Sequence, residues 1–252
     1  QIRVIDTDEH SLFTLNRSLK NKKVRYLLGD ILDSERIEMA GYNTDIVIHL
    51  AAIKNIEVTE YNPIETVNTN INGTINMIKM VIKNKPKKFL NISTDKAVEA
   101  STLYGSTKHL GERLISWAGI HLNPPTKFAT ARFGNVMETK GNVFEVWNDE
   151  NNKNKPLSIT HPSMERYFFH LNEAVEFVLA CIPLINKGEI FVPKMKSFTV
   201  KDMANKISKK HKIIGLREGE KMKEILMTKE EEENSIEKKN LWIINNKNSK
   251  FA

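Results

Sequence analysis

The chain has 252 residues, 40% of them hydrophobic and 27% charged, which is enough apolar material for a full core and predicts a globular protein. Its apolar runs are too short to cross a bilayer, and its one cysteine, Cys181, excludes an internal disulfide, so we expect a cytoplasmic protein without a membrane span. The net charge of +7 comes from lysines dispersed among asparagines and isoleucines rather than grouped with aromatic residues, which argues against nucleic acid as a partner.

Strand-like runs alternate with helical segments through the first half of the chain. The expected strands are residues 2–5, 24–28, 45–50, 88–92 and 127–132. This alternation predicts an α/β fold with a doubly wound parallel sheet. None of the eleven glycines forms the G-x-G-x-x-G turn that follows the first strand of a dinucleotide-binding sheet. We therefore expect residues 2–5 to be the second strand of such a sheet, with the first strand and its turn missing from this sequence.

The longest predicted helix covers residues 63–83. Asn62 is placed to cap it, Pro63 suits the first helical position, and Glu65 completes a capping-box spacing. An apolar stripe at helical spacing predicts the buried face, with Ile64, Val67, Ile71, Ile75, Ile78 and Ile82. A second helix is expected at residues 103–119.

Beyond residue 133 the pattern is less regular, and we expect a smaller substrate lobe there. Helices are predicted at residues 171–184 and 200–208, and a strand at 189–192. Cys181 lies in a periodic apolar run and is expected to be a small core residue. The predicted domains are therefore a nucleotide-binding part at residues 1–134 and a substrate lobe at 135–252, interleaved with the sheet.

Tyr104 and Lys108 lie four residues apart in the second predicted helix, so both side chains project from one face. A lysine there would lower the pKa of the phenol, and Tyr104 could take a hydroxyl proton while a hydride leaves the same carbon. Thr94, Asp95 and Lys96 follow the preceding strand, at the sheet edge where ligands bind. This arrangement predicts oxidation and elimination in one pocket. The alternatives are an ordinary solvated helix for the first pair and a surface ion pair for Asp95 and Lys96.

With these motifs in place, the sequence resembles the extended short-chain dehydrogenase/reductase superfamily, whose members have a Rossmann-like sheet. Within it, nearly the whole chain is similar to the inverting UDP-N-acetylglucosamine 4,6-dehydratases, of the polysaccharide biosynthesis protein family. The motifs that carry the resemblance are GDILD at 29–33, HLAAIK at 49–54, residues 62–70, STDKA at 93–97, YGSTK at 104–108, RFGNV at 132–136, GEIFVPK at 188–194 and REGEK at 217–221.

Two residues narrow the resemblance. Lys96 distinguishes the inverting dehydratases from the other groups of the superfamily. Ordinary sugar-nucleotide 4,6-dehydratases carry Asp-Glu after the threonine, and epimerases lack this acid–base couple. Tyr104 favours the soluble branch, because membrane-bound relatives often have Met at its position. The inverting dehydratases of the soluble branch are therefore the group that the chain most resembles.

The resemblance implies a reaction in two halves. Tyr104 would deprotonate the C4 hydroxyl of a sugar, steadied by Thr94, while Lys108 would bind the nicotinamide ribose and depress the pKa of the phenol. The hydride would pass to the nicotinamide. Lys96 would then remove the C5 proton, which the C4 ketone acidifies, and Asp95 would protonate the departing C6 hydroxyl before the hydride returns to C6.

The resemblance also implies a nicotinamide cofactor. Asp6 would accept hydrogen bonds from the adenosine ribose, and its carboxylate would repel a 2'-phosphate, so NAD is slightly favoured over NADP. Asp6 could instead cap the following helix, and Asp30 could be an ordinary turn carboxylate. The full set of implied cofactor residues is Asp6, Asp30, Ile31, Leu50, Ala51, Ala52, Lys54, Asn70, Ser93, Tyr104 and Lys108.

A UDP-sugar is the implied substrate. The residues placed around it are Asn135, Lys140, Thr160, Arg166, Arg217 and Glu220. Arginine can pair bidentately with phosphate oxygens, although arginines in loops are more often solvated. His161 and His170 lack metal-ligand spacing, so no metal is predicted.

Three functions remain in competition. The leading one is a nucleotide-sugar 4,6-dehydratase in surface polysaccharide or glycan biosynthesis. A 4-epimerase would need Tyr104 and Lys108 but neither Asp95 nor Lys96, and a non-catalytic nucleotide-binding module would need none of them. Relatives commonly associate through the helices predicted at 63–83 and 103–119, which implies a homo-oligomer.

Overall fold

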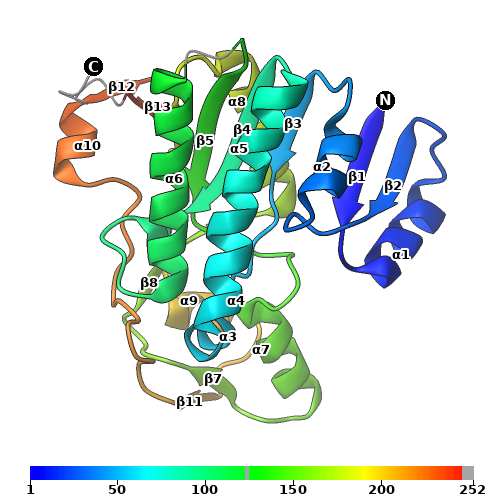
Figure 1. The fold of residues 1–252 in the computed structure, drawn as a ribbon. Helices are drawn as coiled ribbons and strands as arrows, with labels where there is room; N and C mark the ends of the chain where they lie inside the picture. Colours follow the sequence, from blue (N-terminus) through cyan, green and yellow to red (C-terminus); the bar gives the residue numbers. More distant parts are fainter. Residues whose placement is uncertain (123–124, 246–252) are drawn as a thin grey trace.

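A six-stranded sheet forms the centre of the molecule in the computed structural model, which describes residues 1–122 and 125–245 (Figure 1). Its strands lie in the order β12 (Ser235–Glu237), β13 (Leu241–Ile244), β9 (Glu189–Pro193), β5 (Lys127–Phe133), β4 (Lys88–Thr94) and β3 (Ile46–His49). The strands from β3 to β9 run parallel to one another, whereas β13 and β12 add an antiparallel edge. The predicted α/β fold with a mainly parallel sheet is confirmed.

The first two strands form a separate parallel pair, β1 (Ile2–Asp6) and β2 (Val24–Leu28). The helix α1 (Glu9–Leu19) connects them, and α2 (Ser34–Gly41) leads from β2 to β3. In Figure 1 this unit lies beside β3, yet within the described residues β1 pairs with β2 alone. The first half of the chain therefore contributes strands to two separate pieces of sheet.

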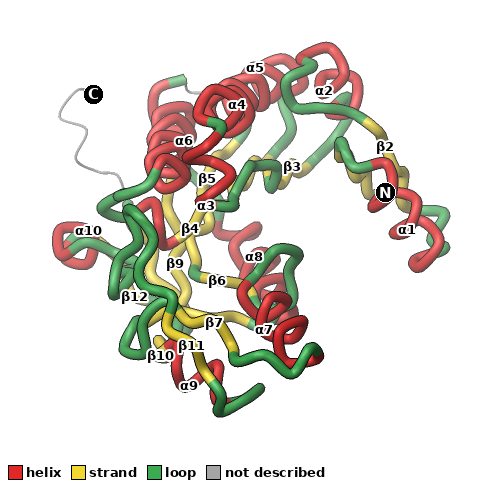
Figure 2. Tube along the Cα trace, turned by 90° about the horizontal axis from the view of Figure 1, so that it is seen from below, coloured by secondary structure: helices red, strands yellow, loops and turns green. Residues whose placement is uncertain are grey.

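Helices cover both faces of the central sheet. The helices α5 (Gly73–Asn84) and α6 (Leu103–His121) lie on one face and α8 (Leu171–Leu184) on the other, as Figure 2 shows. Because successive strand residues point to opposite faces, Phe89 of β4 packs into the core under α5 and α6, and Leu90 into the core under α8. Cys181 lies in the second core, as predicted.

The helix predicted at residues 63–83 is divided into α4 (Pro63–Val67), a π-helical turn (Asn68–Asn72) and α5. Pro63 starts the helix as predicted, but Asn62 does not cap it, since its side-chain amide donates to the Val58 carbonyl at 2.9 Å. The π turn rotates the residues around it, so half of the predicted stripe is wrong. Its members Ile64, Val67 and Ile82 are exposed.

The second half of the chain builds a lobe below the sheet and returns to it. The lobe contains β6 (Asn135–Val136), α7 (Val143–Asn152), β7 (Leu157–Ile159), β8 (Glu165–Phe169), β10 (Ser197–Thr199), α9 (Val200–Asn205) and β11 (His211–Ile213). The buried side chain of Trp147 lies in its core. The helix predicted at 171–184 is confirmed, whereas the one predicted at 200–208 ends at Asn205, where i→i+3 hydrogen bonds tighten the chain.

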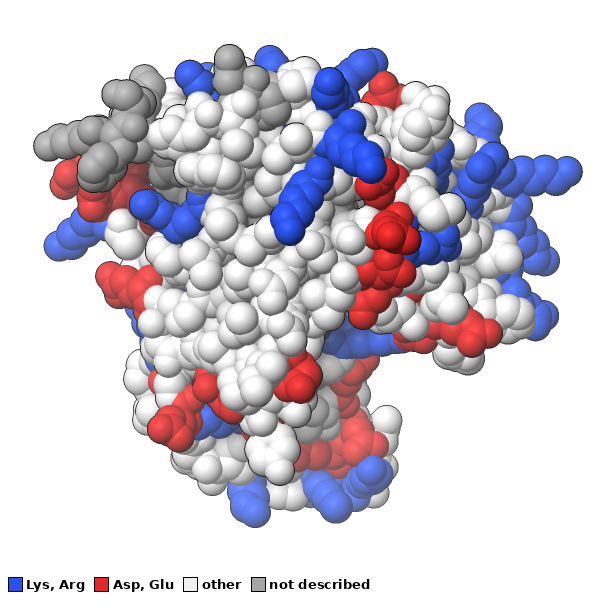
Figure 3. All heavy atoms as spheres, in the orientation of Figure 1, with Lys and Arg blue, Asp and Glu red and all other residues white. Residues whose placement is uncertain are grey.

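The surface agrees with the dispersed charge of the sequence. Lys and Arg are scattered over several elements on the face in Figure 3, and the middle of that face, over α5 and α6, is largely uncharged. In the described part of the chain, no helix is both long enough and apolar enough to cross a bilayer.

Candidate active site

The candidate site forms where β4 ends and α6 begins. A 3-10 turn (Asp95–Ala97) follows β4, and α6 is capped by Thr102, whose hydroxyl accepts from the Gly105 amide at 3.1 Å. Gly105 is required for the close packing between α6 and this turn, because a Cβ there would lie 2.3 Å from the Lys96 carbonyl oxygen. This contact brings Tyr104 to the end of β4.

Four of the predicted catalytic side chains are joined by hydrogen bonds. The Tyr104 hydroxyl is hydrogen-bonded to the Thr94 side chain, and Thr94 Oγ1 donates to Asp95 Oδ1 at 2.9 Å. Lys96 Nζ donates to the same Asp95 oxygen at 3.0 Å and to Asn135 Oδ1 at 3.1 Å. The Asp95 side chain is fully buried and that of Lys96 is 15% exposed, so the alternative of a surface ion pair is wrong.

Lys108 contributes differently from the expectation. Burial and the charge of Asp95 raise the pKa of Tyr104, while the hydrogen bond with Thr94 lowers it. Lys108 Nζ donates to the Ile92 carbonyl at 2.5 Å, and burial lowers the pKa of Lys108 to about 8. The expectation that Lys108 depresses the pKa of Tyr104 is therefore wrong in this structure, because the charge that acts on the phenol is that of Asp95.

Three buried polar atoms around this group have no hydrogen-bond partner among the described residues: Ser93 Oγ, Asp95 Oδ2 and Glu224 Oε2. Buried polar atoms are normally paired, so such atoms mark positions where a ligand or a reacting group is expected. Glu224 was not predicted from the sequence. The available signal was a carboxylate placed directly before the apolar run of residues 225–227.

The acidic residues on the cofactor side form local turns. Asp6 Oδ1 accepts from the Asp8 amide at 2.9 Å, and it is Asp8, not Asp6, that caps α1. Asp30 Oδ1 accepts from the Leu32 amide at 2.9 Å, in the turn role considered as its alternative. The Ile31 side chain packs in the core, where a Cβ on Gly73 would lie 2.3 Å from its Cδ1.

The loop after β3 is held by Asn70, from the π-helical turn. Asn70 Oδ1 accepts from the Ile53 amide at 2.8 Å, and its Nδ2 donates to the Ile53 carbonyl and to Thr107 Oγ1, both at 3.0 Å. The same loop leaves Leu50 and Ala51 exposed and Ala52 half-buried. Asn70 therefore positions the loop against α6, a role that spacing alone did not reveal.

Lys54, in the same loop, reaches toward the second half of the chain. Its Nζ donates to Thr139 Oγ1 at 3.4 Å. Burial lowers the pKa of Lys54, and the charge of Glu145 raises it by a smaller amount.

The predicted substrate residues fall into two sets. Asn135 contacts Lys96 and so lies beside the predicted catalytic group. Arg166 lies 3.7 Å from Glu220, with both side chains about nine-tenths buried. Thr160 is bonded locally, its hydroxyl donating to Met164 Sδ at 3.2 Å.

The structure does not bring Lys140 and Arg217 into this group. Lys140 Nζ donates to Ser11 Oγ at 2.8 Å, and Arg217 Nε lies 2.8 Å from Glu57 Oε1 on α3 (Ile56–Tyr61). Within the described residues, no group of three or more His, Cys, Asp or Glu side chains is arranged to hold a metal ion.

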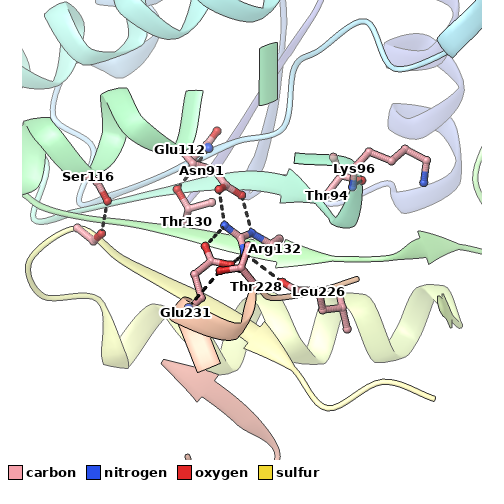
Figure 4. A network of polar contacts seen from close by, with 11 residues as sticks. Asn91, Thr94, Lys96, Glu112, Ser116, Thr130, Arg132, Leu226, Thr228 and Glu231 are labelled. Atoms are coloured by element: carbon pink, nitrogen blue, oxygen red, sulfur yellow. Dashed lines mark hydrogen bonds and ion pairs between the residues drawn. The ribbon is translucent and has the colours of Figure 1, made fainter. Parts of the chain in front are cut away.

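A buried arginine anchors α6 from behind the site. Arg132 on β5 makes two hydrogen bonds to Glu112 of α6, at 2.9 and 2.7 Å, and two to Glu231 of α10 (Lys229–Glu233), at 2.9 and 2.8 Å (Figure 4). Burial disfavours the charged guanidinium and so lowers the pKa of Arg132, but the two carboxylates outweigh this effect and raise it. Because Glu112 belongs to α6, the network fixes the helix that carries Tyr104 and Lys108. Thr94 and Lys96 lie at the end of the neighbouring strand (Figure 4).

Solved structures share this fold. The X-ray structure of Pen from Bacillus thuringiensis is 36% identical, with a TM-score of 0.92 over 96% of this chain and 79% of that chain. A dTDP-glucose 4,6-dehydratase from Streptomyces venezuelae, solved with NAD and TYD bound, has a TM-score of 0.81 at 14% identity, over 92% and 80% of the two chains, which shows the fold alone. The fold and the site define a member of the short-chain dehydrogenase/reductase superfamily.

Curated relatives give the family more closely. The chain is 38% identical to an uncharacterized membrane protein, MJ1061, of Methanocaldococcus jannaschii, over 99% of this chain and 81% of the relative. It is 36% identical to the UDP-N-acetylglucosamine 4,6-dehydratase (inverting) of Campylobacter jejuni, over 97% and 74%. It is 35% identical to a UDP-glucose 4-epimerase of Rickettsia bellii, over 92% and 70%. Residues 1–246 match the family model described as polysaccharide biosynthesis protein, and the chain belongs to that family.

Proposed function

We propose that the chain is a nucleotide-sugar 4,6-dehydratase that converts UDP-N-acetylglucosamine to a 4-keto-6-deoxy sugar with inversion at C5. The observation that carries this proposal is the buried hydrogen-bonded series from Tyr104 through Thr94 and Asp95 to Lys96. Oxidation needs a base at the sugar hydroxyl, and elimination needs an acid and a base on the two neighbouring carbons. The series supplies all three groups in one place.

Each group has a proton to move. Tyr104 takes the proton of the C4 hydroxyl as its own phenolic proton passes to Thr94. Lys96 takes the C5 proton, and Asp95 gives its proton to the C6 oxygen, which leaves as water. Because Thr94 donates to Asp95 at 2.9 Å, the phenolic proton of Tyr104 has a direct route through Thr94 to the Asp95 carboxylate, which then carries the proton given to C6.

We propose that the cofactor is NAD. A bound nicotinamide dinucleotide would accept the hydride from C4 and return it to C6. The residues fit such a group: Ser93 has a buried hydroxyl without a partner, Lys108 has a buried ammonium, and Asp6 ends β1 with an exposed carboxylate. Calorimetric titration should show tighter binding of NAD than of NADP, and the reverse order would contradict the role given to Asp6.

One reaction mixture tests the whole proposal. Purified protein is incubated with UDP-N-acetylglucosamine and either nicotinamide cofactor, and the sugar nucleotide is followed by mass spectrometry. Loss of one water supports the dehydratase. A product of unchanged mass with altered configuration at C4 would instead support a 4-epimerase, which the similarity to the Rickettsia bellii enzyme favours.

We also propose that the chain self-associates through α5 and α6. On α6 the side chains of Leu110 and Trp117, one heptad apart, are 46% and 48% exposed, and Ile82 on α5 is 45% exposed. These residues belong to α5 and α6, the helices over which the middle of the face in Figure 3 is largely uncharged. Exposed apolar side chains that share a face are typical of a protein contact.

A further inference from the structure

The segment of residues 217–226 crosses the candidate site and is fixed at both sides. Toward the turn that carries Lys96, Ser101 Oγ donates to the Gly219 carbonyl at 2.6 Å, and Lys221 Nζ donates to the Val98 carbonyl at 2.8 Å. These two contacts hold the first part of the segment against the catalytic turn.

The second part of the segment is held by β8 and by the core. The Glu165 amide donates to the Met222 carbonyl at 2.8 Å, and Leu226 is buried, with its carbonyl accepting from Arg132 at 3.0 Å. Glu224 lies between these two attachments, so its backbone has little freedom to carry the side chain out to solvent.

The Glu224 carboxyl is buried beside the catalytic group. The residue is 5% exposed, and its Oε2 has no hydrogen-bond partner among the described residues. Burial raises the pKa of Glu224; the charges of Lys96, Arg166 and Lys221 lower it, and that of Asp95 raises it. Arg166 is itself close to Glu220, so Lys96, whenever it carries a proton, is a principal cation facing Glu224.

A buried carboxyl oxygen without a hydrogen-bond partner weakens the fold. Burying an unpaired polar group costs about 1–3 kcal/mol and a charge costs more, so Glu224 is not explained by stability. Residues that break this rule are expected where function requires them.

We propose that Glu224 is a positioning residue whose carboxylate stabilises the ammonium that forms on Lys96 during elimination. This inference rests on the proposed dehydratase function. In that step the C5–H bond breaks and an N–H bond forms on Lys96. The electron pair left on C5 forms the C5–C6 double bond, and the C6 oxygen takes the proton of Asp95 and leaves as water. Glu224 faces the charge that appears on Lys96 and is not itself consumed.

The substitution Glu224→Gln tests the inference, because it removes the charge and keeps the size of the side chain. Water loss should slow by about 10²–10³-fold, as for other groups aimed at a developing charge. Reduction of the nicotinamide, which reports C4 oxidation in a single turnover, should stay within about twofold of wild type, since Glu224 does not act on that step. The acidic limb of the pH–rate profile should change, and Glu224→Asp should restore part of the rate.

Stability separates this role from a structural one. Glu224→Gln should be at least as stable as wild type to urea at pH 8, because it removes a buried charge. The control is Glu218→Gln, an exposed carboxylate on the same segment, which should change neither rate nor stability. A parallel fall of rate and stability in Glu224→Gln, or an unchanged rate of water loss, would overturn the inference.

A spectroscopic measurement is independent of turnover. The carboxyl stretching band that disappears in Glu224→Gln should titrate above the ordinary glutamate range in wild type, and Lys96→Ala should move its midpoint upward, because the charge of Lys96 lowers the pKa of Glu224. An unchanged midpoint would overturn the pairing of Lys96 with Glu224. If the midpoint moves but wild type removes no water, the proposed dehydratase reaction fails instead.

Discussion

At the scale of single residues, Lys96 decides between the two enzyme functions. Its Nζ is held by Asp95 and Asn135 in a largely buried position, which suits a base that acts on one carbon of a fixed ring. Lys96→Ala should lower the rate of water loss by about 10²–10⁴-fold, the usual contribution of a general base, while nicotinamide reduction persists. Both rates can be read by mass spectrometry and by nicotinamide absorbance.

The control for Lys96→Ala is Lys209→Ala, which changes an exposed lysine far along the chain. A Lys96→Ala protein that interconverts C4 epimers at the wild-type rate would support the epimerase.

The protonation of His49 makes the stability of the fold depend on pH. It is buried at the end of β3, where its Nε2 is hydrogen-bonded to Thr74 Oγ1 at 3.1 Å, and burial together with the charge of Lys108 lowers its pKa to about 3. The unfolded chain, with a His pKa near 6.5, therefore binds more protons between pH 6.5 and 3, and stability falls as the pH falls through that window.

The expected loss at His49 is about 1.4 kcal/mol per pH unit. In urea unfolding between pH 7 and 4.5, the slope of stability against pH in wild type should exceed that in His49→Gln by up to about this amount. The exposed His121 serves as control, and His121→Gln should keep the wild-type slope. Equal slopes in all three proteins would contradict a buried neutral His49.

At the scale of elements, two glycines of α6 differ in how closely the rest of the chain packs against them. Gly105 packs against the backbone at Lys96, where a Cβ would lie 2.3 Å from the carbonyl oxygen, whereas a Cβ on Gly111 would meet nothing within 4 Å. Gly105→Ala should therefore displace Tyr104 and lower both stability and activity.

Gly111→Ala in the same helix is the matched control. It should raise stability by about 0.5–1 kcal/mol, because alanine loses less backbone entropy in a helix. Thermal unfolding and turnover measured for both variants check the pair. An active, fully stable Gly105→Ala would show that the close contact is unnecessary.

The Arg132 network gives a second prediction for α6. Glu112→Gln removes one of the two carboxylates that balance a buried guanidinium, and should cost about 3 kcal/mol of unfolding free energy. Since Glu112 also raises the pKa of Lys108, that pKa should drop further in the variant. Urea denaturation and amide hydrogen exchange along α6 measure the effect, with the exposed Glu232→Gln as a control that should behave like wild type.

At the scale of the whole molecule, the uncharged face over α5 and α6 predicts self-association. Trp117→Glu would place a charge at an exposed aromatic residue of α6 and should shift the protein toward the monomer in sedimentation velocity. Phe13→Glu, at an exposed apolar residue of α1 that is 56% accessible, should leave the mass unchanged. A monomeric wild-type protein at micromolar concentration would contradict the proposed contact.

The sequence by itself determined the alternation of strands and helices, the parallel sheet and the motifs at the end of β4, because hydrophobic period and local spacing are properties of neighbouring residues. It therefore placed Thr94, Asp95, Lys96 and Tyr104 in one site. It misjudged the helix of residues 63–83, because a π turn is stabilised by contacts of Asn70 with a distant loop.

Only the tertiary structure decided which distant groups meet that site. Glu224, on which the charges of Lys96 and Arg166 both act, comes from a segment far from the catalytic turn in sequence, and Lys140 turns away to α1. The electrostatics of Lys108 and Tyr104 were likewise set by burial and by the charges of Glu112 and Asp95 rather than by their spacing on the helix. Long-range packing fixes these distances and the desolvation of each charge, and neither quantity is written in a local pattern of residues.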